Sequence, residues 1–252
     1  MHPINKFLSL FGLQLSKIEI KQIDDNERAF RHKYKEYYHL AEGNKRGFEL
    51  LKKYRYEAGS HPVEVHYHDT GFASYYIRKL NPLNILDIGS FRWYIMGLLS
   101  YYNVTTLDIR ERRSDFPNET VVTCDAKSIK LSDNSFDAVL SLGALPHFGL
   151  CRYGDEFDLD ADIKAFNEMI RVLKPGGYLI FSAAITRAKP TILFNAERVY
   201  SHAMIKGFCR SLECIEEKFI DRRNPRYCSF DDISTDPMLF DYYVGCWKKR
   251  AL

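Results

Sequence analysis

Long apolar runs are missing from this chain of 252 residues. No segment approaches the roughly 18 consecutive apolar residues that a membrane-spanning helix needs, so stable insertion into a membrane is not expected. The apolar stretch within residues 2–15 is interrupted by polar residues and lacks the small-residue pattern of a cleaved signal peptide. Internal repeats and low-complexity segments are missing as well. With 46% hydrophobic and 27% charged residues, the composition is ordinary for a soluble globular protein and excludes a largely disordered chain.

Paired cysteine motifs are also missing. The six cysteines form neither a CxxC pair nor the compact framework of a small disulfide-rich secreted domain. We therefore interpret them as reduced thiols and predict a cytoplasmic protein.

The chain also lacks a large excess of positive or negative charge. The net charge is +3, and residues 1–60 hold 12 Lys/Arg against 8 Asp/Glu, which leaves the rest of the chain slightly acidic. The arginine clusters of that remainder lack the interleaved aromatic residues of a single-strand groove, so no nucleic-acid partner is predicted. A basic N-terminal segment can contact an anionic surface, but a solvated helical face is the preferred interpretation.

Residues 1–60 are predicted to form a helical extension. Apolar residues within positions 4–15 recur at helical spacing, and residues 30–51 are rich in aromatic and charged side chains. Such a segment caps the main domain or forms a homodimer contact, and the sequence does not choose between them.

From residue 61 onward, short apolar runs alternate with helical stretches, a pattern typical of βαβ units and a parallel sheet. We predict an α/β fold with helices on both faces of the sheet. The predicted strands are 85–88, 104–107, 120–123, 138–142, 178–182, 214–220 and 242–248. One predicted helix ends at Lys174-Pro175-Gly176-Gly177, before the fifth strand, and another covers residues 196–206. The polar segment 221–241 is predicted to be a functional loop.

Acidic residues follow three successive predicted strands. Asp87 and Gly89 end the first, Asp108 ends the second and Asp125 follows the third. Ligands of open α/β sheets bind outside the carboxyl ends of the strands, and an acid about 20 residues beyond a glycine turn commonly holds a ribose. Each aspartate alone could instead cap the next helix. Together they predict a site for a nucleoside-bearing cofactor.

These positions, with Leu173-Lys174-Pro175-Gly176-Gly177 before the fifth strand, resemble the Rossmann-like (class I) S-adenosylmethionine-dependent methyltransferases over about residues 65–248. The resemblance implies S-adenosylmethionine as cofactor and a seven-stranded sheet whose last strand is antiparallel. It implies that the cofactor is held by three groups of residues and flanked by a fourth: Asp87, Gly89 and Ser90 at the methionine part, Asp108 and Ile109 at the ribose, Asp125 and Ala126 at the adenine, and Ser141, Leu142 and Gly143 beside the methyl group. The class usually has a second glycine where this chain has Phe91, so the turn is expected to be wider or partly filled.

The loop after the fourth predicted strand, residues 144–155, resembles a subgroup of methyltransferase-like proteins associated with surface-glycan biosynthesis. Methyl transfer to oxygen needs an aligned acceptor and usually a base. His147 is the preferred base because its ordinary pKa lies near physiological pH, and a packing role in the loop is the alternative. Tyr153 and Asp155 are the reserve catalytic candidates. Arg152, which suits a carboxylate or phosphate, and Glu156 are predicted to bind the acceptor.

Two further clusters of charged residues occur in the sequence. The acids within residues 155–162 are dense enough for a hard cation, but helix capping and solvation are the preferred interpretation, and no metal is predicted. A late cluster, Arg222, Arg223 and Arg226, is a second candidate for acceptor recognition.

The sequence therefore predicts a methyltransferase that uses S-adenosylmethionine to methylate an oxygen of a small polar or carbohydrate-derived acceptor, with surface polysaccharide biosynthesis as one setting. Two alternatives stay open. One is a methyltransferase-like protein that binds a partner through residues 1–60 without turnover. The other is a nicotinamide-dependent oxidoreductase, which the lack of a GxGxxG motif weakens.

Overall fold

The computed structural model describes residues 25–43, 49–52 and 63–251, and the chain divides into two compact units, Met1–Pro62 and Val63–Leu252. In the first unit, helix α2 spans Asp25–Gly43, within the predicted helical extension. The Phe30 ring lies 6.3 Å from that of Tyr34 and 6.2 Å from that of Tyr37, so this helix carries an aromatic side. The apolar positions noted within residues 4–15 lie outside the described residues.

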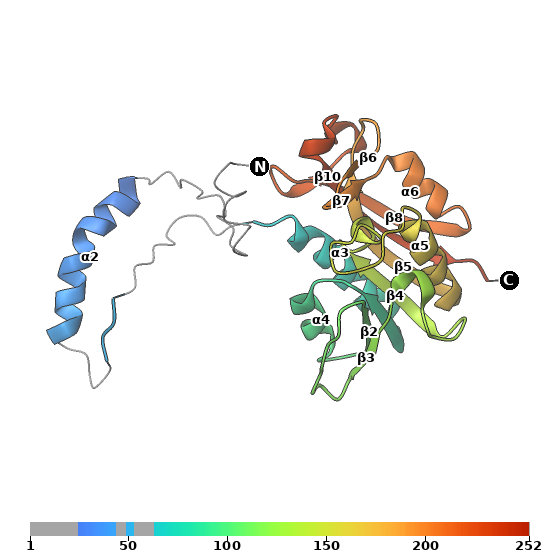
Figure 1. The fold of residues 1–252 in the computed structure, drawn as a ribbon, viewed down its shortest axis with the longest axis horizontal. Coiled ribbons are helices and arrows are strands. Elements are labelled where there is room, and N and C mark those ends of the chain that lie inside the picture. The colour runs from blue at the N-terminus through green and yellow to red at the C-terminus, as the bar shows by residue number, and fades with distance from the viewer. Residues whose placement is uncertain (1–24, 44–48, 53–62, 252) are drawn as a thin grey trace, which may run out of the picture. The chain divides into compact units, whose positions relative to one another are not determined.

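A sheet of eight strands forms the centre of the second unit, in the order β3-β2-β1-β4-β5-β10-β8-β9 (Figure 1). The strands are β1 Asn84–Ile88, β2 Asn103–Asp108, β3 Glu119–Thr123, β4 Phe136–Leu142, β5 Leu173–Ile185, β8 Leu212–Asp221, β9 Arg226–Cys228 and β10 Asp241–Lys249. The first five strands pair in parallel, and β10 runs antiparallel to both of its neighbours. The predicted mostly parallel sheet with an antiparallel last strand is confirmed.

The strand count and one helix differ from the prediction. The extra strand β9 pairs with β8 inside segment 221–241, which was predicted as a loop. A hairpin of β6 (Thr191–Leu193) and β7 (Glu197–Val199) occupies the start of the predicted helix 196–206. Helix α6 begins only at His202 because Ser201 caps it, accepting a hydrogen bond from the Met204 N–H at 3.3 Å.

Helices cover both faces of the sheet, as predicted. Helices α3 (His66–Leu80) and α4 (Arg92–Leu98) pack on one face, and α5 (Ala161–Val172) and α6 (His202–Phe208) pack on the other (Figure 1). Ile85 joins the core under α3 and α4, whereas Leu86 and Ile88 join the core under α5 and α6. This alternation follows because successive side chains of a strand point to opposite faces.

The predicted end of α5 is also found. The helix stops at Val172, and Lys174–Gly177 forms an irregular part of β5 between the pairs Phe136–Leu173 and Ala138–Tyr178. Pro175 has no N–H with which to continue the helix, and Gly176 has a φ of +79° that favours glycine. No helix in the described parts of the chain is both long and apolar enough to cross a membrane.

Candidate active site

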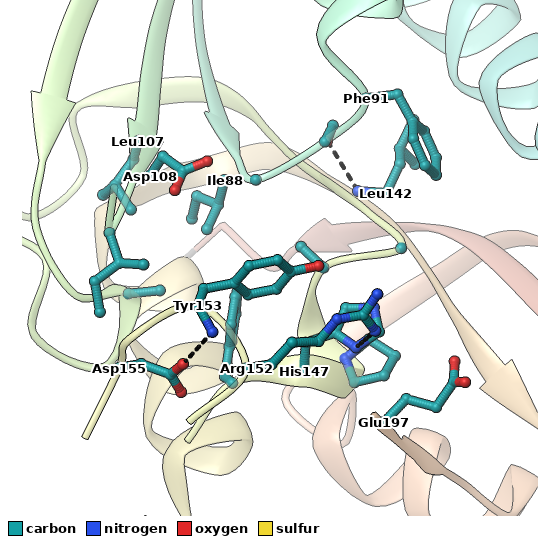
Figure 2. Close-up of a pocket in the computed structure, with 18 of the residues that line it drawn as sticks. Ile88, Phe91, Leu107, Asp108, Leu142, His147, Arg152, Tyr153, Asp155 and Glu197 are labelled. Carbon is teal, nitrogen blue, oxygen red and sulfur yellow. Dashed lines mark hydrogen bonds between the residues drawn. The ribbon is translucent and has the colours of Figure 1, made fainter. Parts of the chain in front are cut away.

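A cavity of about 460 Å³ lies where β1, β2, β3 and β4 end, within the usual size range of small-molecule sites. It brings together twelve of the predicted site residues: Gly89, Ser90, Asp108, Ile109, Asp125, Ala126, Leu142, Gly143, His147, Arg152, Tyr153 and Asp155. Figure 2 shows Asp108 on one side of this cavity and Glu197 on the other, with Tyr153, Arg152 and His147 drawn between them. The predicted residues Asp87, Ser141 and Glu156 do not line it.

The turn after β1 is fixed to the end of β4 by two serines. Gly89 adopts a φ of +70°, which favours glycine. The Ser90 hydroxyl accepts the Leu142 N–H at 2.9 Å, and the fully buried Ser141 hydroxyl donates to the Ile88 carbonyl at 3.2 Å. Ser141 therefore supports the turn from beneath and does not face a ligand.

Asp87 lies under the same turn. Burial raises the pKa of its carboxyl to about 7, although hydrogen bonds from Ser90 oppose this shift. Its Oδ1 has no hydrogen-bond partner among the described residues. Because an unpaired buried acceptor is costly, this oxygen suits a ligand ammonium that reaches it directly or through water.

Asp108, at the end of β2, is held by two arginines. Its Oδ1 accepts the Arg110 backbone N–H and Nε, both at 2.9 Å, and its Oδ2 accepts Arg110 Nη2 at 2.8 Å and Arg112 Nη2 at 3.3 Å. Burial opposes ionisation, but these contacts outweigh it and hold the pKa of Asp108 below its usual range. A carboxylate offers about four acceptor positions, so a ribose hydroxyl must displace one of these contacts.

Asp125 both caps a short helix and lines the cavity. Its Oδ1 accepts the Lys127 N–H at 3.0 Å and so caps the short 3₁₀ helix η2 (Ala126–Ser128). The same residue and Ala126 also line the cavity. Capping therefore does not remove Asp125 from the site.

His147, in the 3₁₀ helix η3 (Leu145–His147), is partly buried on the other side of the cavity. Its Nδ1 lies 2.6 Å from the Ala196 carbonyl oxygen and 3.1 Å from Arg152 Nη1. We assign the proton to Nδ1, because a carbonyl can only accept. His147 Nδ1 and Arg152 Nη1 therefore do not bond to each other, and both donate to the Ala196 carbonyl. Burial lowers the pKa of His147, the Ala196 contact opposes this, and the Arg152 charge adds to the lowering. The imidazole is therefore neutral at pH 7, with Nε2 as its basic nitrogen.

The loop after η3 carries Arg152, Tyr153 and Asp155. The guanidinium carbons of Arg110 and Arg152 lie 4.6 Å and 5.3 Å from the centre of the Tyr153 ring. Asp155 accepts the backbone N–H groups of Tyr153 at 3.0 Å and Cys151 at 3.3 Å, so its carboxylate shapes the loop.

Glu156, which was predicted to bind the acceptor, does not line the cavity. Its side chain is 85% exposed and contacts Lys127 Nζ at 3.4 Å. Nearby, Asp158 pairs with Lys164 at 2.7 Å. Among the residues that the structure describes, no group of three or more His, Cys, Asp or Glu side chains is arranged to hold a metal ion.

Arg198, which the sequence did not indicate, holds this loop against β7. It donates from Nη1 to the Phe148 carbonyl at 2.5 Å and from Nη2 to the Leu159 carbonyl at 3.0 Å. Its side chain is buried, and its Nε lies 3.6 Å from the buried carboxylate of Asp162. A lone arginine in a hairpin of three-residue strands gives no sequence signal for this role.

Phe91 forms part of the cavity wall. Its ring centre lies 4.3 Å from that of His66 and 5.9 Å from that of Trp93. A Cβ added to Gly143, which has a φ of +70°, would lie 3.1 Å from the Phe91 ring, so the ring packs directly on that glycine. The Phe91 ring thus fills part of the space next to the turn, and the cavity lies beside the ring.

Several residues that line the cavity were not among the predicted site residues: His66, Phe91, Arg110, Glu197, Arg222, Phe240 and Tyr242. Two of them carry a sequence signal: Phe91 departs from the family pattern, and Arg222 belongs to an arginine cluster. Glu197 was missed because a helix was predicted over its hairpin. Its place in the cavity depends on the pairing of β6 with β7.

The sheet order and the cavity at the strand ends define a Rossmann-like α/β fold of the class I methyltransferase type. Residues 86–181 match the family described as "Methyltransferase domain". This part of the chain thus matches a methyltransferase domain, and the predicted resemblance to S-adenosylmethionine-dependent methyltransferases and the cofactor class are confirmed for it.

Individual relatives are more distant. Over 201 residues the chain is 28% identical to phthiotriol/phenolphthiotriol dimycocerosates methyltransferase 1 of Mycobacterium ulcerans, covering 75% of this chain and 64% of that protein. It is 29% identical over 158 residues to a malonyl-(acyl-carrier protein) O-methyltransferase of Marinomonas sp., covering 54% of each. The match thus spans less than two thirds of either relative. The structure of 1,6-didemethyltoxoflavin-N1-methyltransferase from Burkholderia thailandensis, with bound S-adenosylhomocysteine, aligns over 94% of both chains at 14% identity, with a TM-score of 0.56.

Proposed function

We propose that this protein transfers the methyl group of S-adenosylmethionine to an oxygen of a small polar acceptor, with a carbohydrate-derived acceptor as the narrower form of the proposal. The main support for this proposal is a single cavity that is lined by Asp108 and Asp125 on one side, where they suit a nucleoside, and by the neutral His147 on the other. When bound, the cofactor supplies a methyl group already activated by its sulfonium.

The residues around β1 to β3 suit the cofactor. Asp108 and Asp125 line the cavity at two successive strand ends and can bind the ribose and the adenine. The glycine turn at Gly89 lets the backbone approach a ligand closely, and the unpaired Oδ1 of Asp87 beneath it can accept a hydrogen bond from the methionine ammonium.

His147 is the proposed base. Its Nδ1 is occupied by the Ala196 carbonyl, which leaves Nε2 to take the proton of an acceptor hydroxyl. Its lowered pKa keeps this nitrogen unprotonated at neutral pH. Tyr153 and Asp155 are weaker candidates, because Asp155 is engaged by backbone N–H groups and the Tyr153 ring lies against two arginines.

The curated relatives give limited support for oxygen as the acceptor atom. One is an O-methyltransferase, and the other is a methyltransferase of dimycocerosates of phthiotriol and phenolphthiotriol. The structurally similar protein from Burkholderia thailandensis is an N1-methyltransferase, so nitrogen acceptors belong in the test.

Two measurements test the proposal. Calorimetric titration with S-adenosylhomocysteine should show saturable binding, and methyl-tritiated S-adenosylmethionine should label a member of a panel of sugars, sugar nucleotides, polyols and small acids or amines. His147→Ala should keep the affinity for S-adenosylhomocysteine and lose most of the turnover, a factor of about 10² or more. His202→Ala is the matched control, because His202 does not line the cavity. Absence of cofactor binding would refute the proposal, and turnover unchanged in His147→Ala would refute the assigned base.

A further inference from the structure

Two arginines from distant parts of the chain line the acceptor side of the cavity. Arg152 belongs to the loop after η3, and Arg222 directly follows β8. Glu197 and Tyr242 line the same cavity, and the charges of both arginines oppose the rise in pKa that burial causes in each of these two side chains. Arg152 Nη1 also lies 3.0 Å from the carbonyl of Ala196, the residue before Glu197, so the two arginines lie at the same end of the cavity. Figure 2 shows Arg152 and Glu197 at this end, away from Asp108.

Neither guanidinium is neutralised by a carboxylate of the described residues within 4.0 Å, unlike Arg110, which forks onto Asp108. Arg152 donates from Nη1 to the Ala196 carbonyl at 3.0 Å, and its other N–H donors have no acceptor among the residues that the structure describes. The guanidinium carbon of Arg222 lies 4.4 Å from the centre of the Phe240 ring, a cation–π contact that uses none of its N–H donors.

The nearby carboxylate does not cancel these charges. Glu197 is half-buried, and its burial raises its pKa, which the charges of Arg222 and Arg152 oppose. Two guanidinium groups against one carboxylate leave this end of the cavity with net positive charge. An oxyanion is the ligand that arginine forks match best.

Resting on the proposed function, we propose that the methyl acceptor carries an anionic group, a carboxylate or a phosphate monoester, and that Arg152 and Arg222 bind it together. The proposal adds to the methyltransferase assignment a specificity: acceptors with an oxyanion are selected over their neutral analogues. Glu197 limits the affinity for the anion and disfavours acceptors with two negative charges at this end.

The test uses inorganic phosphate and acetate as separate probes, titrated at constant ionic strength into the full-length protein, with and without S-adenosylhomocysteine. Saturable binding is expected to the loaded protein. Arg152→Ala and Arg222→Ala should each weaken binding about tenfold, and the stronger of the two probes identifies the anionic group. Glu197→Gln should strengthen binding severalfold, an opposite sign that structural damage would not produce.

Arg223→Ala is the matched control, because Arg223 adjoins Arg222 in sequence but contacts Asp221 and does not line the cavity. Equal affinities in Arg222→Ala, Arg223→Ala and the unchanged protein would overturn the inference. Anion binding that disappears on loading S-adenosylhomocysteine would also overturn it, since the arginines would then serve the carboxylate of the cofactor. Anion binding by the two arginines without any binding of S-adenosylhomocysteine would instead refute the proposed function alone.

Discussion

Replacing Arg110 with alanine is expected to tighten the binding of S-adenosylhomocysteine. The Arg110 side chain donates two hydrogen bonds to Asp108, the residue best placed to hold a ribose, and its guanidinium also stacks on Tyr153. A ribose that binds Asp108 has to displace at least one of these contacts. Arg110→Ala removes both side-chain hydrogen bonds. The Asp108 carboxylate then keeps the backbone N–H of residue 110 at 2.9 Å and Arg112 Nη2 at 3.3 Å as donors.

The size of the effect follows from the exposure of the pair. The Arg110 side chain is 58% exposed and that of Asp108 is 9% exposed. Exposed ion pairs contribute about 0.2 to 1 kcal/mol, and the fork geometry places this one near the upper end, at about 1 kcal/mol. Removing that competition should lower the dissociation constant of S-adenosylhomocysteine about fivefold.

Calorimetric titration at fixed pH and salt measures this change. Arg113→Ala is the control, since Arg113 is exposed, lies in the same basic segment and does not line the cavity. The reasoning is refuted if Arg110→Ala weakens binding, which would make Arg110 a contact of the cofactor, or if it matches the control. Thermal melts of both variants check that the fold is retained.

Three other changes give separate tests. Methyl transfer should fall as the pH drops through the pKa of His147, and since that pKa is lowered, the acid limb should lie below about 6.5; a limb above that value in a rate profile would contradict the assignment. Phe166→Ala should lower the free energy of unfolding by about 3 to 5 kcal/mol, because this ring is almost fully buried; denaturant unfolding that shows under about 1 kcal/mol would be inconsistent with the described packing. Gly149→Ala should destabilise by about 2 kcal/mol or more, because the residue has a φ of +71° and its Cβ would overlap the Asp158 carbonyl, whereas Gly154→Ala, with positive φ but open space, should cost less in the same melts.

Most of the sheet was predictable because its strands are short apolar runs that end at polar residues. The run that contains Ile85 and Leu86 is buried on both faces of the sheet. Its continuous apolar sequence predicts a strand without knowledge of the strands that pair with it. The hairpin at Glu197 and the edge strand β9 were not predictable, since their three-residue strands carry mixed polarity and depend on pairing. Helix α3 was not among the specific predicted elements either.

The candidate site was predictable where a residue follows a strand. Asp108, Asp125 and Gly143 reach the cavity because the carboxyl ends of parallel strands meet at one edge. Asp87 and Ser141 also belong to strand ends, and both side chains are buried beneath the turn; Ser141 is bonded to the Ile88 carbonyl there, whereas Asp87 keeps an unpaired oxygen for a ligand. A pattern of residue types locates the strand end but does not say which of its side chains remain open to a ligand.

The sequence by itself determined the methyltransferase type of fold and the edge of the sheet at which a ligand binds, because both follow from local hydrophobic runs and the polar residues that end them. Only the tertiary structure decided that Arg110 occupies Asp108 and that Arg152, Glu197 and Arg222 face one end of the cavity. These residues lie in loops and a hairpin whose positions are set by contacts between distant segments, and such contacts have no periodic signature in a single chain.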